Sequence, residues 1–147
     1  MESKYSPLML KNQLCFPVYL CSKEIIRKYT PLLKKLDLTY TQYVVMMYFW
    51  ERRTSNVKDI SRALLLDSGT LTPLLKKLEA KGYITRNRAA KDERNLEVTV
   101  TEKGLKLREK ALSIPESIAK CINLSEKEAE TLYKITHKIL ANVLNDN

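Results

Sequence analysis

Glycine, proline and histidine are scarce in this chain, and each scarcity excludes a class of structure or site. Three glycines and five prolines among 147 residues leave little material for turns, so long helices should dominate over sheet. With one histidine and no Cys-x-x-Cys spacing, a four-ligand zinc site has no support, and neither metal nor cofactor is expected. Three cysteines are too few, and odd in number, for the disulfide framework of a secreted protein.

Long apolar runs are also missing. No segment approaches the roughly 18 uncharged apolar residues that a membrane span requires, so no membrane partner is expected. The first five residues lack the basic and then apolar layout of a secretory signal, which predicts a cytoplasmic protein. Hydrophobic residues make up 44% of the chain, enough for one folded domain over residues 1–147.

Positive charge is what the chain has in excess. Its 26 Lys and Arg residues against 17 Asp and Glu residues give a net charge of +9. Such an excess suits a polyanionic partner, either nucleic acid or an anionic membrane surface, but it is also found in ordinary basic proteins. The positions of the charges must decide between these interpretations.

Helices are predicted at both ends of the chain. In the segment 8–36, Pro17 and Pro31 each remove a backbone donor, which predicts a broken or kinked helix. Towards the other end, helices are predicted over about 102–111 and 126–144, the last after a capping pattern that begins at Ser125. Since one small core cannot bury this much helix, the regions 8–36 and 102–144 are expected to pack against a second copy.

The middle of the chain begins with a helix that should be buried. Thr39 and Gln42 have the spacing of a capping box, and the following residues up to Trp50 are apolar on nearly every side. A polar turn is predicted over 52–56, and a short amphipathic helix over 57–65.

The next helix, over about 67–82, presents two different faces. Asp67 or Ser68 can cap its start, and Gly82 provides its end. Leucines at positions i, i+3, i+4 and i+7 predict a core stripe, namely Leu71, Leu74, Leu75 and Leu78. The opposite face is polar and carries Thr70, Thr72, Lys76 and Lys77.

Two strands are predicted next, over 83–88 and 96–101, on either side of a charged tip at 89–95. Apolar residues alternate with polar ones in the second strand, which is the pattern of a half-buried strand. Because a two-stranded hairpin is not stable by itself, it is expected to pack against neighbouring helices. The hairpin is rich in cations, namely Arg86, Arg88, Lys91 and Arg94. Asp92 and Arg94 can pair with each other, which would shape the tip, or with a neighbouring strand.

This order of elements predicts a mainly α fold with a small β-hairpin, the winged helix-turn-helix, with a DNA-binding core and wing over about 39–101. In such a fold the second helix of the motif enters the major groove with its N-terminal end leading. Ser68, Thr70 and Thr72 would then reach base edges or phosphates, and Lys76 a phosphate. The cations of the hairpin would follow the DNA backbone or enter the minor groove, unless they are only solvated charges. The expected partner is double-stranded DNA with a near-palindromic operator, bound by a homodimer.

Several stretches also carry a family resemblance. The order of elements, the segment 67–76 and the wing sequence Asp92-Glu93-Arg94 resemble the MarR family of regulators. The segments 12–19 (Asn-Gln-Leu-Cys-Phe-Pro-Val-Tyr) and 38–43 (Leu-Thr-Tyr-Thr-Gln-Tyr) are similar to its OhrR-like branch, the organic-hydroperoxide-sensing repressors. The likeness covers about residues 10–115.

The resemblance implies a redox mechanism. Cys15 matches the peroxide sensor of this branch, and Tyr29 and Tyr40 match the tyrosines that hold it. Tyr19, also found in the branch, lies four residues after Cys15 and would share its helix face. A thiolate attacks the peroxide, tyrosine hydroxyls can stabilise the thiolate by hydrogen bonds, and oxidation gives a sulfenic acid. The implied protein is a repressor, not an enzyme, that binds DNA when reduced and releases it when oxidised by an organic hydroperoxide.

Of the other two cysteines, only Cys121 matches a position with a known role in this branch. One subtype of the branch resolves the oxidised sensor across the dimer with a second cysteine, and Cys121, just after the helix that contains Pro115, lies at about that sequence distance. In the other subtype a small thiol does this, and Cys121 would be a passive buried residue. Cys21 is assigned no role.

Three alternatives remain open on the sequence. A MarR-type regulator that senses a small phenolic or lipophilic ligand would respond without Cys15. A thiol peroxidase would consume hydroperoxide catalytically, although no Cys-activating motif supports this. A winged helix used as a protein-interaction module would lack the steep salt dependence of DNA binding.

Overall fold

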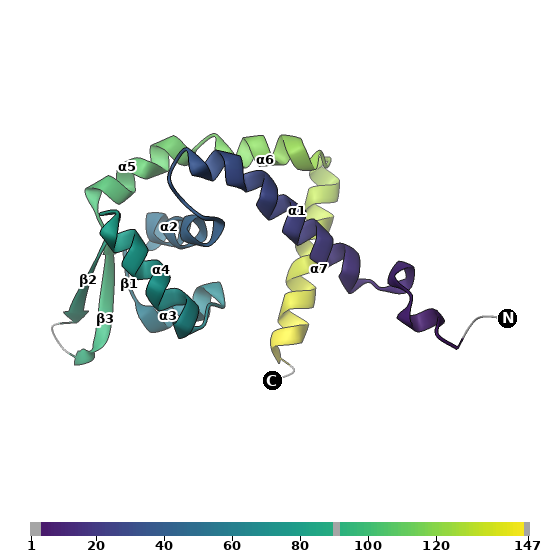
Figure 1. Cartoon of the computed structure of the whole chain (residues 1–147), viewed down its shortest axis with the longest axis horizontal. Coiled ribbons are helices and arrows are strands. Elements are labelled where there is room, and N and C mark those ends of the chain that lie inside the picture. Colours follow the sequence, from purple (N-terminus) through teal and green to yellow (C-terminus); the bar gives the residue numbers. More distant parts are fainter. Residues whose placement is uncertain (1–3, 90–91, 146–147) are drawn as a thin grey trace. The chain divides into compact units, whose positions relative to one another are not determined.

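The computed structural model of the chain describes residues 4–89 and 92–145, and Figure 1 labels its elements. It divides into two compact units, Met1–Ile114 and Pro115–Asn147. None of the helices described combines the length and the apolar character that crossing a membrane requires. The elements, in chain order, are η1 (Ser6–Leu8), η2 (Leu10–Asn12), α1 (Cys15–Lys34), α2 (Tyr40–Arg52), β1 (Thr54–Asn56), α3 (Val57–Leu64), α4 (Ser68–Ala80), β2 (Ile84–Ala89), β3 (Asp92–Val100), α5 (Glu102–Ala111), α6 (Ile114–Ile122) and α7 (Glu126–Asn145).

The first long helix, α1, is continuous over 20 residues, so the predicted break is wrong. Pro17 lies in the first turn, where a backbone N–H has no acceptor within the helix and its loss costs nothing. Pro31 lies in the last turn, where it removes a single helical hydrogen bond. The helix begins at Cys15, later than predicted, because the residues before it form the two short 3-10 turns η1 and η2.

The central helix, α2, starts with the predicted capping box. The backbone N–H of Gln42 donates to Thr39 Oγ1 at 3.3 Å, and the backbone N–H of Thr39 donates to Gln42 Oε1 at 3.0 Å. The helix is the centre of the first unit, as predicted. Its buried residues are Gln42, Tyr43, Val45, Met46 and Phe49.

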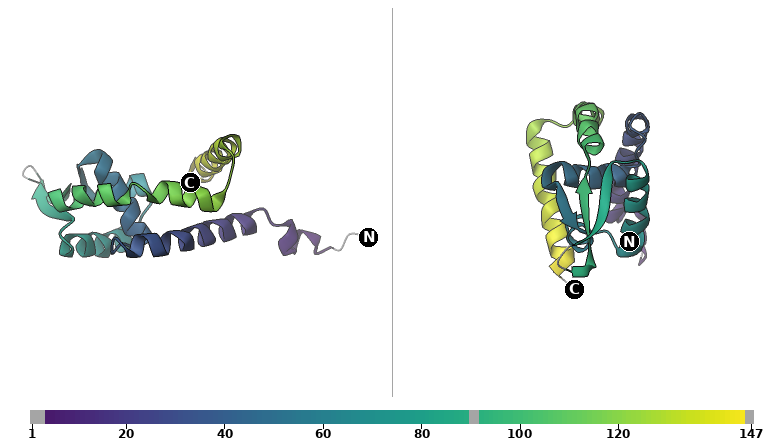
Figure 2. Two further views of the ribbon diagram at one scale, coloured as in Figure 1. Left: turned by 90° about the horizontal axis from the view of Figure 1, so that it is seen from above. Right: turned by 90° about the vertical axis from the view of Figure 1, so that its left-hand side faces the viewer.

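The predicted hairpin is present as β2 and β3, and β1 adds a third antiparallel strand to it, in the order β1-β3-β2. The right-hand view of Figure 2 shows its strands side by side. The prediction of a turn at 52–56 was wrong because Thr54, Ser55 and Asn56 pair with β3. β3 begins earlier than predicted, at Asp92, since the pairing of β2 with β3 extends to Ala89 and Asp92, whereas β2 keeps the predicted length.

The predictions for the remaining helices of the first unit are confirmed. All four leucines of the α4 stripe are buried, and α3 and α5 lie where they were predicted. Gly82, with φ of +75°, follows the end of α4 in the left-handed conformation that glycine adopts most easily.

The second unit consists of α6 and α7. The predicted cap of α7 is confirmed, because the backbone N–H of Ser125 donates to Glu128 Oε2 at 2.9 Å. Cys121 lies in the last turn of α6, not after it. Every residue of α7 whose burial is described is exposed, including a set of large apolar side chains: Leu132, Tyr133, Ile135, Ile139, Leu140, Val143 and Leu144.

Candidate functional site

Helices α3 and α4 form a helix-turn-helix with a tight connection. The side chain of Asn56 caps α3 by accepting the backbone N–H of Asp59 at 2.8 Å. Leu65 ends α3 in the left-handed conformation, with φ of +52°, and Ser61 Oγ donates to the carbonyl oxygen of Leu66 at 2.5 Å. Only three residues, 65–67, therefore separate α3 from the start of α4 at Ser68.

The start of α4 is held by Asp67. Its carboxylate accepts the Thr70 hydroxyl at 2.8 Å and the Thr70 backbone N–H at 2.9 Å. These bonds, the one from the hydroxyl first, lower the pKa of Asp67 below its ordinary value of 3.8. The Thr70 hydroxyl, predicted to face DNA, is thus engaged in the cap. The other predicted contacts of this helix, Ser68, Thr72 and Lys76, are exposed.

Arg86 was predicted to reach DNA, but its guanidinium is engaged with Glu79 of α4. Nε and Nη2 of Arg86 donate to Glu79 Oε2 at 2.9 and 2.6 Å, and the backbone N–H of Arg86 donates to Glu79 Oε1 at 3.0 Å. The Arg86 side chain is only 18% exposed. Arg86 therefore fastens β2 to α4 instead of projecting as a free cation.

The remaining predicted wing residues belong to the distal part of the hairpin. Arg88 lies in β2, while Asp92 and Arg94 lie in β3. The side chains of these three, and the whole of Lys91, lie outside the described residues. Their roles stay predictions.

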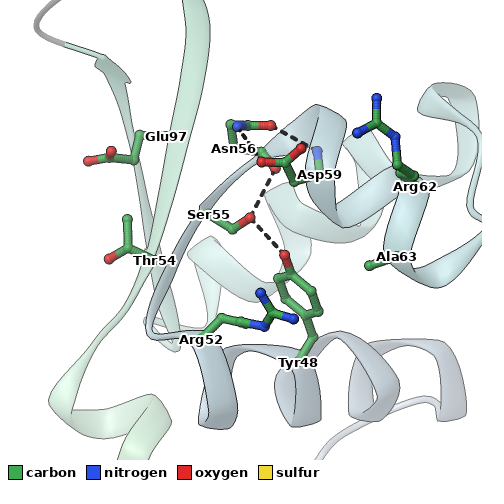
Figure 3. Close-up of a pocket in the computed structure, with 9 residues that line it drawn as sticks. All are labelled: Tyr48, Arg52, Thr54, Ser55, Asn56, Asp59, Arg62, Ala63 and Glu97. Carbon is green, nitrogen blue, oxygen red and sulfur yellow. Dashed lines mark hydrogen bonds between the residues drawn. The ribbon is translucent and has the colours of Figure 1, made fainter.

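A hollow of about 570 Å³ opens beside β1, lined by residues of α2, α3 and β3 as well (Figure 3). The Tyr48 hydroxyl and Ser55 Oγ lie 2.8 Å apart and join α2 to β1. The Arg52 guanidinium lies 5.9 Å from the centre of the Tyr48 ring, and Arg62 projects from α3. Asp59 and Glu97 lie on the same walls, so the lining carries no net charge.

Two of the predicted sensor tyrosines are in contact. The rings of Tyr29 on α1 and Tyr40 on α2 pack edge to face, with centroids 4.9 Å apart. Burial, and then the proximity of Tyr40, raises the pKa of Tyr29 above 10.0. The Tyr29 hydroxyl therefore keeps its proton at neutral pH and can donate a hydrogen bond to an anionic sulfur.

Cys15 is not part of this tyrosine pair within one chain. It opens α1 and is exposed, and Tyr19, one turn further, is 60% exposed. Cys15 and Tyr29 are fourteen residues apart on this helix, about 21 Å at ~1.5 Å per residue. Cys21 and Cys121 are exposed as well in the single chain, and both roles considered for Cys121 stay predictions.

Other aromatic residues of α2 continue the tyrosine pair and were missed by the sequence analysis. Tyr43 packs against Tyr29 with ring centroids 6.0 Å apart, and Trp50 packs against Tyr43 at the same distance. The indole N–H of Trp50 donates to the carbonyl oxygen of Gly104 in α5 at 2.9 Å. The seven-residue spacing of Tyr43 and Trp50 places both on one helix face, which is visible in the sequence, but the contact with Gly104 is not.

Comparison with known proteins agrees with this architecture. The family described as transcriptional regulator SarA/Rot matches residues 27–111, more than half of the chain. The organic hydroperoxide resistance transcriptional regulator of Bacillus subtilis (strain 168) is 45% identical over 92% of this chain and 90% of its own length. The regulator SarZ of Staphylococcus aureus (strain USA300) is 48% identical over 84% of this chain and 83% of its own.

A solved structure matches almost the whole chain. Reduced AbfR bound to DNA superposes with a TM-score of 0.79 and 33% identity, over 97% of this chain and 99% of AbfR. AbfR, a protein of Staphylococcus epidermidis, is also known in a disulfide-formed structure. From the matched family, these identities and the winged helix-turn-helix fold, the protein belongs to the MarR and SarA/Rot transcription regulators, in the OhrR-like organic-hydroperoxide-resistance branch.

Proposed function

We propose that this protein is a homodimeric DNA-binding repressor that releases its operator when an organic hydroperoxide oxidises Cys15. The observation that carries the proposal is the position of Cys15, an exposed thiol that begins α1 in a chain 45% identical to an organic hydroperoxide resistance regulator. The protein is a regulator and not an enzyme, so each thiol is oxidised once and must be reduced before it reacts again.

DNA binding is supported by the exposed face of α4. Ser68 and Thr72 lie near its start and Lys76 further along, where they would meet base edges and phosphates in the major groove. The N-terminus of the helix adds the positive end of its dipole. The net charge of +9 and the likeness to reduced AbfR bound to DNA support the same partner.

The dimer is supported by the reach of α1 and by exposed apolar surface. Because Cys15 lies about 21 Å along α1 from Tyr29, the pair of Tyr29 and Tyr40 can reach the sulfur only from a second copy of the chain. The apolar residues of α7 listed above, together with Val18 and Leu20 of α1, are left exposed in a single chain. Burying them in a dimer through the predicted regions 8–36 and 102–144 removes this surface from water.

The chemistry begins with the Cys15 thiolate. Its sulfur attacks the terminal oxygen of the hydroperoxide, the O–O bond breaks, and the alkoxide leaves and takes a proton to become an alcohol. Sulfur is oxidised to the sulfenic acid, Cys15–SOH, and the peroxide is reduced. The hydroxyls of Tyr29 and Tyr40 donate to the thiolate before this step, and they lose that acceptor after it.

Cys121 then acts as the resolving residue in this proposal. Its thiolate attacks the Cys15 sulfur, forming a disulfide and releasing the sulfenic oxygen as water. Exposure of Cys121 and the existence of a disulfide-formed structure of AbfR support this assignment. A dithiol reductant reverses the step by thiol exchange.

The test is a fluorescence-anisotropy titration of the reduced protein onto DNA from its own upstream region, followed by one equivalent of cumene hydroperoxide per subunit. Wild type should release the DNA and regain it with dithiothreitol, whereas Cys15→Ser should bind and not release. Cys21→Ser is the matched control on the same helix and should behave as wild type.

Three other outcomes contradict the proposal. Release by both wild type and Cys15→Ser means that Cys15 is not the switch. If neither protein releases, a regulator that responds to a small phenolic or lipophilic ligand is the better account. Consumption of many equivalents of hydroperoxide per subunit would instead indicate a thiol peroxidase.

A further inference from the structure

We infer that Tyr43 and Trp50 are positioning residues that connect the sensor tyrosines to the base of the wing. The inference rests on the proposed function and adds the route by which oxidation of Cys15 changes DNA binding. It concerns only contacts within the first unit of the chain.

One end of the route is the tyrosine cluster. Tyr29 contacts both Tyr40, at 4.9 Å between ring centroids, and Tyr43, at 6.0 Å. Tyr43 is 3% exposed, so its ring is enclosed by its neighbours. A change in the position of Tyr29 therefore meets the Tyr43 ring directly, and a change at Tyr40 reaches it through Tyr29.

The other end is the first turn of α5. Trp50 packs edge to face on Tyr43, and its indole N–H donates to the Gly104 carbonyl oxygen at 2.9 Å. Gly104 is tightly enclosed: a Cβ at this position would lie 2.2 Å from the Tyr83 carbonyl oxygen and 2.8 Å from Val100 Cγ2. Tyr83 precedes β2 and Val100 ends β3, so Gly104 packs against the base of the wing.

Hydrogen bonds tie this base together. Thr101 caps α5 by accepting the Gly104 backbone N–H at 3.0 Å, and its hydroxyl donates to the Gly82 carbonyl oxygen at 2.6 Å. The backbone N–H of Thr101 donates to the Tyr83 carbonyl oxygen at 3.0 Å. The first turn of α5 and both wing strands are thus one connected body.

Close packing allows these contacts to pass a displacement from the sensor tyrosines to the wing. Protein interiors have few voids, so a displaced ring moves its neighbours instead of filling empty space. Gly104, which accepts the Trp50 N–H, has no free space on its side towards Tyr83 and Val100, so a displaced Gly104 presses on the base of the wing. A change at Tyr29 and Tyr40 is therefore expected to alter the wing, whose cations are predicted to contact DNA.

The test compares Trp50→Phe with Tyr48→Phe. The first keeps a ring at position 50 and removes the N–H that reaches Gly104; the second removes a hydroxyl from the same helix that bonds Ser55, away from the route. For each protein we would measure the Cys15 oxidation rate, the operator Kd of the reduced form, and the ratio of oxidised to reduced Kd.

Trp50→Phe should be oxidised at the wild-type rate and bind DNA normally when reduced, but its Kd ratio should fall by about fivefold, within the range of coupling that such residues carry. Tyr48→Phe should keep the wild-type ratio. A merely structural role for Trp50 would change reduced binding or thermal stability and leave the ratio intact. An unchanged ratio in Trp50→Phe overturns the inference while leaving the proposed function in place.

A second measurement needs no substitution in the route. Trp50 is the single tryptophan of the chain, so the fluorescence of the protein reports its surroundings. Oxidation of wild type should shift this emission, and the same hydroperoxide should not shift it in Cys15→Ser. If oxidised wild type releases DNA with unchanged emission, Trp50 is not on the route. If wild type is not oxidised at all, the proposed function fails, and this inference with it.

Discussion

The carboxylate of Glu79 holds Arg86 by both its side chain and its backbone. Glu79 Oε2 accepts two N–H groups of the guanidinium, at 2.9 and 2.6 Å, and Oε1 accepts the Arg86 backbone N–H at 3.0 Å. The bond thus fixes the backbone of β2 against α4, the helix proposed to enter the major groove. The pair therefore joins the wing to α4.

The Glu79–Arg86 pair makes stability depend on pH. Hydrogen bonding from the Arg86 guanidinium lowers the pKa of Glu79 below its ordinary 4.5, so the folded state favours the ionised carboxylate. The pair therefore stabilises the folded protein fully when the pH is above 4.5, the ordinary pKa of a glutamate. This stabilisation is lost as the pH falls through the lower pKa that Glu79 has in the folded protein. In Glu79→Gln, the free energy of unfolding from urea titrations should decline less steeply between about pH 5 and pH 3 than in wild type. Glu51→Gln, an exposed residue of α2, should keep the wild-type slope.

The contribution of Lys76 to DNA binding should appear as a change in salt dependence. Each neutralised phosphate contributes about 0.9 to the slope of log K against log salt, so loss of Lys76 from both subunits should reduce the slope by about 2. Operator affinities of Lys76→Gln measured at several salt concentrations check this. Lys28→Gln, an exposed residue of α1, should leave the slope unchanged. Equal slopes in all three proteins would place Lys76 away from the DNA.

The tight fit of Gly104 predicts a large effect of a single methyl group. In Gly104→Ala the new Cβ would clash with the Tyr83 carbonyl oxygen at 2.2 Å, and either the first turn of α5 or the base of the wing must move. We expect a loss of about 1–3 kcal/mol in the free energy of unfolding, as for other overpacked sites. In Gly69→Ala the nearest atom is a side-chain oxygen of Asp67 at 3.0 Å, so that variant should change stability much less.

The role of Cys121 can be seen on a non-reducing gel. After one equivalent of cumene hydroperoxide, wild type should migrate as a disulfide-linked dimer, since the proposed resolving cysteine comes from the partner chain. Cys121→Ser should stay a monomer on the gel, with Cys15 trapped by a sulfenic-acid reagent. Cys21→Ser should form the linked dimer as wild type does. A linked dimer in Cys121→Ser would assign the resolving role to another thiol.

Much of the helical part of the fold could be predicted because its signals are local. The capping box at Thr39, the leucine stripe of α4 and Gly82 all act over a few residues, and each element they predicted is present. β1 could not be predicted in this way. Its three polar residues form a strand only because the edge of β3 offers them hydrogen-bond partners more than forty residues away.

The candidate site was predictable in its residue types but not in its contacts. Thr70 and Arg86 are polar residues near the proposed DNA surface, as the sequence suggested, yet Asp67 and Glu79 already engage them. Such pairs depend on how a helix meets a turn or a strand, which spacing alone does not determine. The aromatic contacts of Trp50 were missed for the same reason, since Gly104 is fifty-four residues further along the chain.

The uninterrupted length of α1 has a genetic consequence. In the proposed dimer, each sensor consists of Cys15 from one subunit and Tyr29 from the other. A Cys15→Ser allele therefore removes the sulfur of one sensor, and a Tyr29→Phe allele removes the tyrosine hydroxyl of the sensor whose sulfur lies in the partner. Co-expressed, they form mixed dimers in which one sensor carries both lesions and the other carries none. Two alleles that are each unresponsive should therefore complement one another and restore derepression by hydroperoxide, whereas two alleles altered at the same position should not.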